Sequence, residues 1–226
     1  MSRWLAEALA VAGKDLRAEF RTRVAINSLA LFALTTLAAV SYTIGPYRLA
    51  DEDRPFLLSV LFWIVVFFAA LAGLDRSFVK EEESHTAPLL KLAAAPSVVW
   101  AGKLLYNMVL IVVLMAMLTP LYCILMGFEV VMPWRFVGLL AAGGFSLAVI
   151  TTIVAAIIAQ AMTRGALFSV LSLPLLLPLL IFLIQGTTAI STGHVEAYTD
   201  SVRAGLSMGG VMTVVSAGLF PVVWND

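Results

Sequence analysis

Charged residues are scarce in this 226-residue chain, because Asp, Glu, Lys and Arg together fill only 12% of its positions. Soluble proteins use about 25%. Hydrophobic residues fill 62% of the positions, and the mean hydropathy is +1.01. A chain with so few polar groups cannot cover a water-facing surface. The composition therefore predicts an all-α integral membrane protein.

An excess of basic charge is also missing, since 14 basic residues balance 14 acidic ones. Without a basic stripe, nucleic acid is excluded as a partner. A single cysteine, Cys123, excludes an internal disulfide and a cysteine-based metal cluster. The two histidines, His85 and His194, are expected on opposite sides of the membrane and do not have the spacing of a metal site. We therefore expect no metal in this chain.

The motifs of common catalytic sites are absent. The sequence contains neither the phosphate-binding pattern G-x-x-x-x-G-K-[S/T] nor the serine-nucleophile pattern G-x-S-x-G. Its membrane-crossing segments hold almost no charges away from their ends, whereas ion-coupled transporters need ligands near the middle of the membrane. These absences disfavour an enzyme and a secondary transporter, and any ATP hydrolysis would come from a partner chain.

Residues 1–23 combine an apolar face with basic residues at helical spacing. The apolar residues are Leu5, Ala8, Leu9, Ala12, Leu16 and Phe20, and the basic ones are Arg3, Lys14, Arg17, Arg21 and Arg23. A helix of this kind lies in the membrane surface instead of crossing it, with its basic residues near anionic lipid. The segment is too charged throughout for a signal peptide.

Six apolar segments have the length of about 20 residues that a bilayer crossing requires. They cover residues 24–44, 56–74, 104–128, 136–162, 165–184 and 204–223. Residues 186–203 are polar enough to predict a loop between the last two. Ten Lys and Arg residues lie on the side of the N-terminus and four on the other side, which predicts that both chain ends are cytoplasmic. We expect a single domain, with spans 1 and 2 in residues 24–74 and spans 3 to 6 in residues 104–226.

Residues 75–103 form the longest polar interruption and are predicted to be a cytoplasmic loop. Thr86 is suited to cap a short helix that tolerates Pro88 in its first turn. An apolar surface on this helix suits insertion into a groove of a soluble partner. The alternative is a turn that only lies on lipid headgroups. The residues expected to form the docking loop are Lys80, Glu81, Glu82, Glu83, His85, Thr86, Leu89, Leu90 and Leu92.

Two further patterns concern the packing of the spans. Pro174 and Pro178 lie four residues apart in the fifth span and predict a kink. Gly205 and Gly209 form a G-x-x-x-G pattern in the sixth span, which predicts close contact with another helix.

Particular residues along nearly the whole chain match one family. They are Ile44-Gly45-Pro46, Trp63, Leu74-Asp75-Arg76-Ser77-Phe78, Lys103, Arg164-Gly165 and Leu173-Pro174-Leu175-Leu176-Leu177-Pro178-Leu179-Leu180-Ile181-Phe182. In these features the chain resembles CcmB, the membrane subunit of the ABC-type transporter of cytochrome c maturation. The family usually shows Gly-Ser-Leu-Glu after an acidic pair, whereas this chain lacks that glycine in the loop.

The resemblance implies a six-span ABC-2-type permease of the bacterial inner membrane. Its partners would be an ABC ATPase subunit, a haem-handling membrane subunit, a small single-span subunit and a periplasmic haem chaperone, and a homodimer is compatible with this set. Residues 80–92 would hold the helix that couples to the ATPase. Haem is implied as a transported or partner-bound ligand, with ATP on the ATPase subunit and no cofactor on this chain.

Several functions stay open at this level. ATP could drive haem through the chain or could drive release of the haem-loaded chaperone. An ABC-2 exporter of a lipid, a drug or a polysaccharide, and a membrane scaffold that transports nothing, would share the same spans. His194 is the only imidazole expected on the outer face, so its role also stays open.

Overall fold

The computed structural model describes residues 3–45, 52–74, 77, 78, 81, 85–159 and 165–225. The helices of this part are α1 (Arg3–Thr22), α2 (Val24–Thr43), α3 (Arg54–Leu74), α5 (Ala87–Ala93), α6 (Pro96–Met126), α7 (Pro133–Ala159), α8 (Gly165–Thr192) and α9 (Val195–Asn225). Six of them, α2, α3 and α6 to α9, are long and apolar enough to cross a membrane. The all-α fold with six spans is therefore confirmed.

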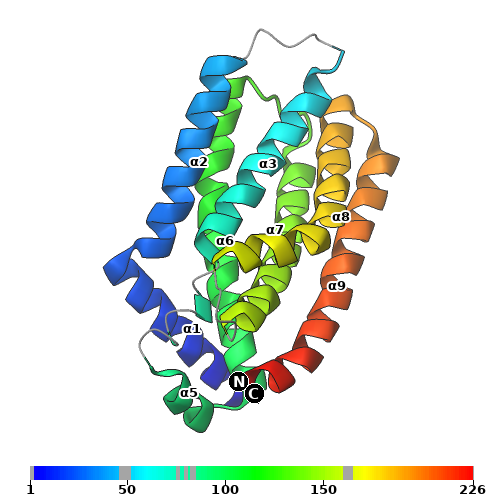
Figure 1. Ribbon diagram of the computed structural model, residues 1–226. Helices are drawn as coiled ribbons and strands as arrows, with labels where there is room; N and C mark the ends of the chain where they lie inside the picture. Colours follow the sequence, from blue (N-terminus) through cyan, green and yellow to red (C-terminus); the bar gives the residue numbers. More distant parts are fainter. Residues whose placement is uncertain are drawn as a thin grey trace.

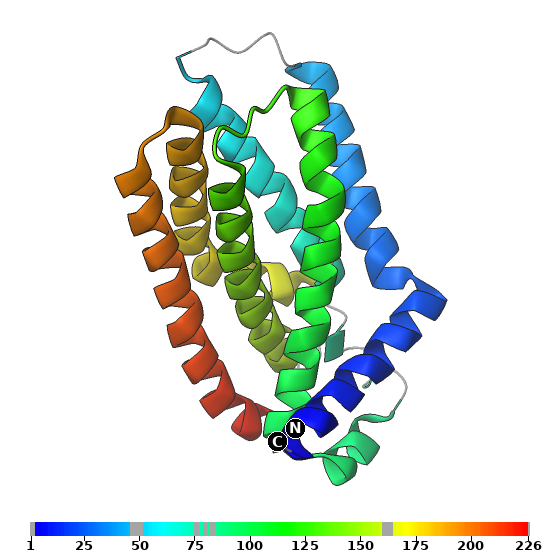
Figure 2. The ribbon, with the colours of Figure 1, turned by 180° about the vertical axis from the view of Figure 1, so that it is seen from behind.

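Helix α7 occupies the centre of the bundle (Figures 1 and 2). In the most apolar 18-residue stretch of α7, 83% of the residues are buried, whereas in the corresponding stretch of α9 only 17% are. Helix α7 packs against α3, α6, α8 and α9, while α2 lies at the edge against α3 and α6. The sequence of α7 is apolar on every side and rich in small residues, which suits a helix that has neighbours all round.

Helix α1 lies at an angle to the bundle beside the start of α6 (Figure 2). It contacts α6 through Ala8, Val11 and Ala12, which are buried. Gly102 of α6 makes this approach possible, because a Cβ atom at that position would lie 2.6 Å from the Cβ of Val11. Arg23 then turns the chain into α2 with a left-handed φ of 55°.

Two predicted boundaries are wrong. Helix α6 begins at Pro96, eight residues before the span predicted at 104–128, because Pro is well suited to the first helical position and Val98 and Val99 continue the apolar face. Residues 186–203 are also helical, apart from Gly193 and His194. Hydroxyl side chains in the first part of this segment donate to carbonyls four residues earlier, so they are satisfied within α8. The polar composition of the segment therefore did not require a loop.

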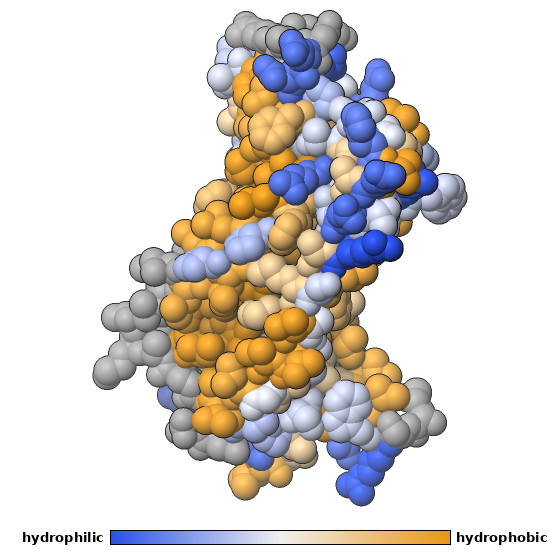
Figure 3. Space-filling view, turned by 90° about the vertical axis from the view of Figure 1, so that its right-hand side faces the viewer, coloured by the Kyte–Doolittle hydropathy of each residue, from blue (hydrophilic) through white to orange (hydrophobic). Residues whose placement is uncertain are grey.

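Both chain ends lie at the same end of the bundle, beside α5 (Figures 1 and 2). We call this the α5 end, and the opposite end, which holds the turn between α8 and α9, the His194 end. On the face shown in Figure 3, polar side chains are concentrated towards the upper end, a few lie at the lower end, and apolar side chains cover most of the surface between them. This distribution matches an apolar belt that faces lipid.

Helix α8 changes direction along its length, since its first part lies across the bundle and its later part runs along it (Figure 1). Pro174 and Pro178 are both inside this helix. Each proline removes one helical hydrogen bond. That they cause the bend stays a prediction. Four residues that carry the family resemblance lie outside the described residues. They are Pro46, Asp75, Arg76 and Arg164.

Candidate functional site

The short helix α5 presents apolar side chains to the outside at the α5 end. Leu89 is 66% exposed and Leu92 is 87% exposed, whereas Leu90 packs against the core of the bundle. Exposed leucines on a short helix outside the spans are typical of an interaction site. Of the other predicted docking residues, Lys80, Glu82 and Glu83 lie outside the described part of the chain.

Thr86 precedes α5, but its side chain does not cap the helix as predicted. Its backbone has φ −98° and ψ −7°, whereas a capping residue usually adopts an extended conformation. The hydroxyl group instead donates to the carbonyl of Glu81 over 3.4 Å. His85 is exposed and adopts a left-handed φ of 52°. His85 and Thr86 form the turn that leads into α5.

Four charged side chains are brought together at the base of this turn. We call Lys14, Asp15, Glu81 and Lys103 the ion cluster. The Nζ atom of Lys103 lies 2.6 Å from a carboxylate oxygen of Glu81 and 3.0 Å from one of Asp15. Lys14 pairs with the same two residues at 2.7 Å and 3.2 Å. Lys103 and Glu81 are 1% and 4% exposed, so these two charges are held away from water, whereas the side chain of Lys14 is half exposed.

Each charge in the cluster is balanced by its neighbours. Burial raises the pKa of Glu81, but the charges and hydrogen bonds of Lys103 and Lys14 outweigh burial, and the pKa lies below its usual value. Burial lowers the pKa of Lys14, but the hydrogen bond to Glu81 and the charge of Asp15 outweigh it, so the pKa is raised. Lys103 also donates to the carbonyl of Ser77 over 2.5 Å. The cluster thereby joins α1, α6 and the segment before α5.

A second buried carboxylate, Glu19, fixes the corner between α1 and α2. One of its oxygens accepts the backbone N–H of Ile26 at 3.0 Å, and the other accepts the hydroxyl of Tyr106 at 3.4 Å. Glu19 is 5% exposed. The second half of α1 is thus tied to the bundle by polar contacts as well as by packing.

Aromatic rings join the segment before α5 to the end of α9. The ring of Phe78 lies 5.6 Å from that of Phe220 and 5.9 Å from that of Trp224. The ammonium group of Lys91 in α5 lies 5.5 Å from the centre of the Trp224 ring. Helix α5 and the described residues just before it therefore contact three other helices, α1, α6 and α9.

Sequence reasoning did not find the ion cluster. Lys14 was expected to face anionic lipid, and Asp15 was assigned no role. A signal was present, because Asp15 and Glu19 lie on the same side of α1 as the buried residues Ala8 and Val11. Carboxylates on an apolar helix face require partners, and here these come from distant parts of the chain.

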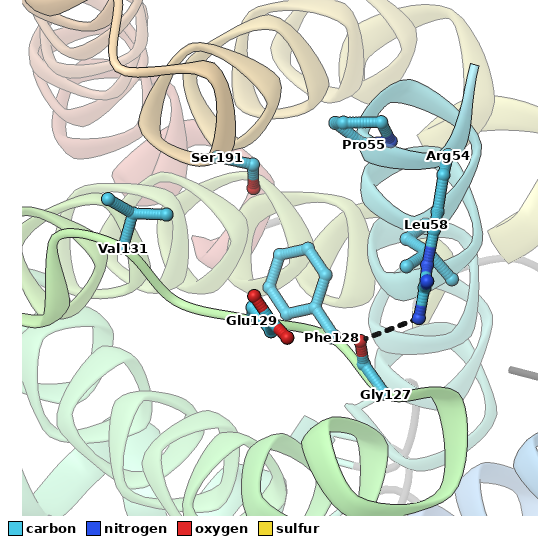
Figure 4. A pocket seen from close by; sticks show the side chains of 8 residues that line it. All are labelled: Arg54, Pro55, Leu58, Gly127, Phe128, Glu129, Val131 and Ser191. Atoms are coloured by element: carbon cyan, nitrogen blue, oxygen red, sulfur yellow. Dashed lines mark hydrogen bonds between the residues drawn. The ribbon is translucent and has the colours of Figure 1, made fainter. Parts of the chain in front are cut away.

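Two cavities lie at the His194 end. The smaller one, of about 180 Å³, is lined by α3, α8 and the connection between α6 and α7 (Figure 4). In it, Arg54 donates to the carbonyl of Gly127 over 3.1 Å. The larger one, of about 670 Å³, lies between α3, α8 and α9 and has His194 among its lining residues. The Nδ1 atom of His194 lies 2.8 Å from the hydroxyl of Thr192. Among the described residues, no group of three or more His, Cys, Asp or Glu is placed to hold a metal ion.

The glycine pair of α9 lies beside α7. A Cβ atom on Gly209 would collide with the Ser146 hydroxyl and lie 3.3 Å from the ring of Phe145. The same hydroxyl donates to the carbonyl of Gly205 over 3.0 Å. At Gly205, in contrast, a Cβ atom would meet only Leu179 of α8 at 3.9 Å. The close approach to α7 is therefore at Gly209.

Comparison with known proteins agrees with this architecture. The family model described as CcmB protein matches residues 6–225, which extend from α1 to the end of α9. Heme exporter protein B of Bradyrhizobium diazoefficiens is 28% identical over 181 residues, which cover 80% of this chain and 80% of that protein. With six apolar helices, the chain is a multi-pass membrane protein. Because the match extends over almost its whole length, the chain belongs to the CcmB family.

Proposed function

We propose that this chain is the membrane subunit of an ABC-type haem exporter of cytochrome c maturation, and that it couples ATP hydrolysis by a separate subunit to that process. Membership of the CcmB family supports the exporter role, as does the name of the similar Bradyrhizobium protein. The coupling role depends on one observation. Helix α5 exposes Leu89 and Leu92 while its base is held by buried charges.

In this proposal α5 inserts its two exposed leucines into an apolar groove of the ATPase subunit. The ion cluster makes the base of α5 rigid, because moving Glu81 away from Lys103 would leave charges buried without partners. A displacement of α5 is therefore passed to α1 and α6. The contact between Lys91 and Trp224 passes it to α9 as well.

The resulting movement of the spans either exports haem or releases the haem-loaded periplasmic chaperone. The proposed partners are the ATPase subunit, a haem-handling membrane subunit, a small single-span subunit and the chaperone, with a homodimer of this chain as a further assembly. Haem is substrate or partner-bound ligand in this scheme. We place the α5 end, with both chain ends, in the cytoplasm of a bacterium and the His194 end in the periplasm, as the Lys and Arg distribution favours.

The first test is purification of the tagged chain from its native membrane in mild detergent. Mass spectrometry identifies the proteins that accompany it, and an absorbance spectrum of the same sample detects haem. We expect an ATPase subunit together with haem-handling membrane proteins. An ATPase without any haem protein would instead indicate an exporter of another substrate, and the absence of both would indicate a scaffold.

The second test addresses coupling. Leu89→Asp and Leu92→Asp place a charge on the proposed contact surface, and we expect the ATPase rate of the assembled complex to fall by about tenfold or more, as at a binding hot spot. Leu89→Met and Leu92→Met are the matched controls, because they keep an apolar side chain of similar size at each position. Equal ATPase rates in the aspartate variants, the methionine controls and the wild type would contradict a coupling role for α5.

The proline pair of α8 provides a third test. Replacement of Pro174 and Pro178 by alanine restores two helical hydrogen bonds and is expected to straighten α8. We expect less covalent haem attachment to c-type cytochromes, while the ATPase subunit still accompanies the chain. Normal haem attachment in this variant would show that the bend is not required.

A further inference from the structure

An apolar groove with a volume of about 520 Å³ lies between α1 and α6. None of its lining residues has a polar side chain. The α1 wall consists of Leu9, Ala12, Gly13 and Leu16, and the α6 wall consists of Leu105, Met108, Val109, Val112 and Val113. The groove belongs neither to the ion cluster nor to the exposed face of α5.

The groove lies at the edge of the contact between α1 and α6, because Ala12 lines it and is also buried against α6. The packed side of α1 contains Ala8 and Val11, whereas Leu5, Leu9 and Phe20 are 44%, 49% and 57% exposed. On α6, Val112 is 62% exposed. Both helices therefore leave apolar surface uncovered where the groove opens. Because α6 is a membrane span and α1 has the pattern of an interfacial helix, lipid chains border this opening.

An empty or water-filled groove is unfavourable at this place. Water would find no hydrogen-bond partner among the lining side chains. A void would lose the dispersion contacts that close packing provides. An acyl chain that enters from the neighbouring leaflet restores those contacts.

A row of basic residues runs along α1 next to the groove. Arg17 and Arg21 follow Gly13 at intervals of four residues, so they share its side of the helix. Both arginines are exposed, and neither forms an ion pair with a described residue. An uncompensated cation at the membrane surface attracts an anionic headgroup.

We propose that the groove between α1 and α6 binds one acyl chain of an anionic phospholipid from the leaflet on which α1 lies, and that Arg17 contacts the lipid headgroup. The lipid fills the space beneath α1 and supports its position against α6. This site goes beyond the proposed function, since it requires neither haem nor an ATPase subunit, and its test can fail or succeed independently of that function.

The test is native mass spectrometry of the purified full chain in detergent, with phosphatidylglycerol or phosphatidylethanolamine of identical acyl chains added. Gly13→Leu fills the groove without a clash, because no atom lies within 4 Å of a Cβ built at Gly13. Gly210→Leu on α9 is the matched control, because its Cβ position is equally open. We expect the wild type and Gly210→Leu to retain one phosphatidylglycerol, and Gly13→Leu to lose it.

The charge is tested separately with Arg17→Gln, an exposed position whose change does not disturb packing. We expect the preference for phosphatidylglycerol over phosphatidylethanolamine to fall about fivefold, the effect of one basic residue near an anionic surface. Arg203→Gln, at the other end of the molecule, is expected to leave the preference unchanged. Equal lipid retention by the wild type and Gly13→Leu, or an unchanged preference in Arg17→Gln, would overturn the proposal.

Discussion

The two ends of the bundle are held together by different interactions. At the α5 end, buried Lys103 joins carboxylates of α1 and of the segment before α5. At the His194 end, single side-chain hydrogen bonds to backbone carbonyls join neighbouring elements, such as Tyr122 to Leu58 at 2.6 Å and Arg54 to Gly127 at 3.1 Å. Open pockets occur at both ends, of about 180 Å³ and 670 Å³ at the His194 end and of about 390 Å³ beside the ion cluster, so the difference between the ends lies in the polar contacts.

This difference indicates which end can change shape. Buried charges tolerate little displacement, because each partner that moves away leaves a charge without compensation. Single hydrogen bonds that are not part of a buried ion pair are cheaper to rearrange. The α5 end is therefore suited to pass on a force as a rigid unit, and the His194 end is suited to respond to it.

Removing the charge of Lys103 is expected to have the largest effect. Lys103→Met leaves Glu81 and Asp15 with only Lys14, which is half exposed, so we expect a loss of about 3 to 5 kcal/mol in the free energy of unfolding. The thermal-unfolding midpoint in detergent measures this loss. Lys103→Arg keeps the charge and is expected to retain much of the stability. An unchanged midpoint for Lys103→Met would show that the ion cluster does not hold the α5 end together.

Crowding the contact between α1 and α6 is expected to have the next largest effect. In Gly102→Ala the new methyl group meets the side chain of Val11 and lies 3.0 Å from the carbonyl of Ala8. Such overpacking costs about 1 to 3 kcal/mol, and we expect α1 to become accessible to limited proteolysis at lower temperature. Gly13→Ala on the open side of α1 is the control and is expected to leave cleavage of α1 unchanged. Similar cleavage of both variants would mean that the close approach at Gly102 does not position α1.

A hydrogen bond at the His194 end is expected to contribute less. Tyr122→Phe removes the hydroxyl that donates to the carbonyl of Leu58, and we expect a loss of about 1 kcal/mol by the same unfolding measurement. The ring contacts of Tyr122 with Phe62 and Phe128 persist in the variant. If Tyr122→Phe cost as much as Lys103→Met, the contrast between the two ends would be wrong.

Acidification is expected to have the smallest effect and to act at the α5 end. The folded chain lowers the pKa of Glu81 from its usual 4.5, so its stabilising contribution is complete above pH 4.5 and is lost as the pH falls through the lower folded value. The unfolding midpoint of the wild type should therefore decrease below pH 4.5. Glu81→Gln cannot titrate at this position and is expected to show a weaker decrease. Identical pH profiles would show that another group is responsible.

Local sequence patterns were sufficient to predict the six spans and the amphipathic helix at the N-terminus. A run of about 20 apolar residues has few stable arrangements in a membrane other than a helix, and that preference depends on nearby residues alone. The exposure of Leu89 and Leu92 was also within reach, because both lie in the polar interruption of residues 75–103, outside the predicted spans. The role of these leucines in coupling stays a proposal.

Two segments were misjudged because local polarity was taken as a sign of a loop. Residues 186–192 satisfy their hydroxyl groups within α8, so they remain helical. Residues 96–103 were assigned to the polar loop that ends at Lys103, but they form the start of α6. The charge of Lys103 is neutralised by Glu81 and Asp15 inside the protein.

The sequence by itself determined where the chain is apolar, and hence the number of spans and the class of the protein. Only the tertiary structure decided how the charges at the α5 end are used. Lys14 and Glu81 are 67 residues apart and Glu19 and Tyr106 are 87 apart, so no local pattern contains both partners. Burying a charge is favourable only when its partner is brought close by the packing of the helices, and that packing depends on the whole chain.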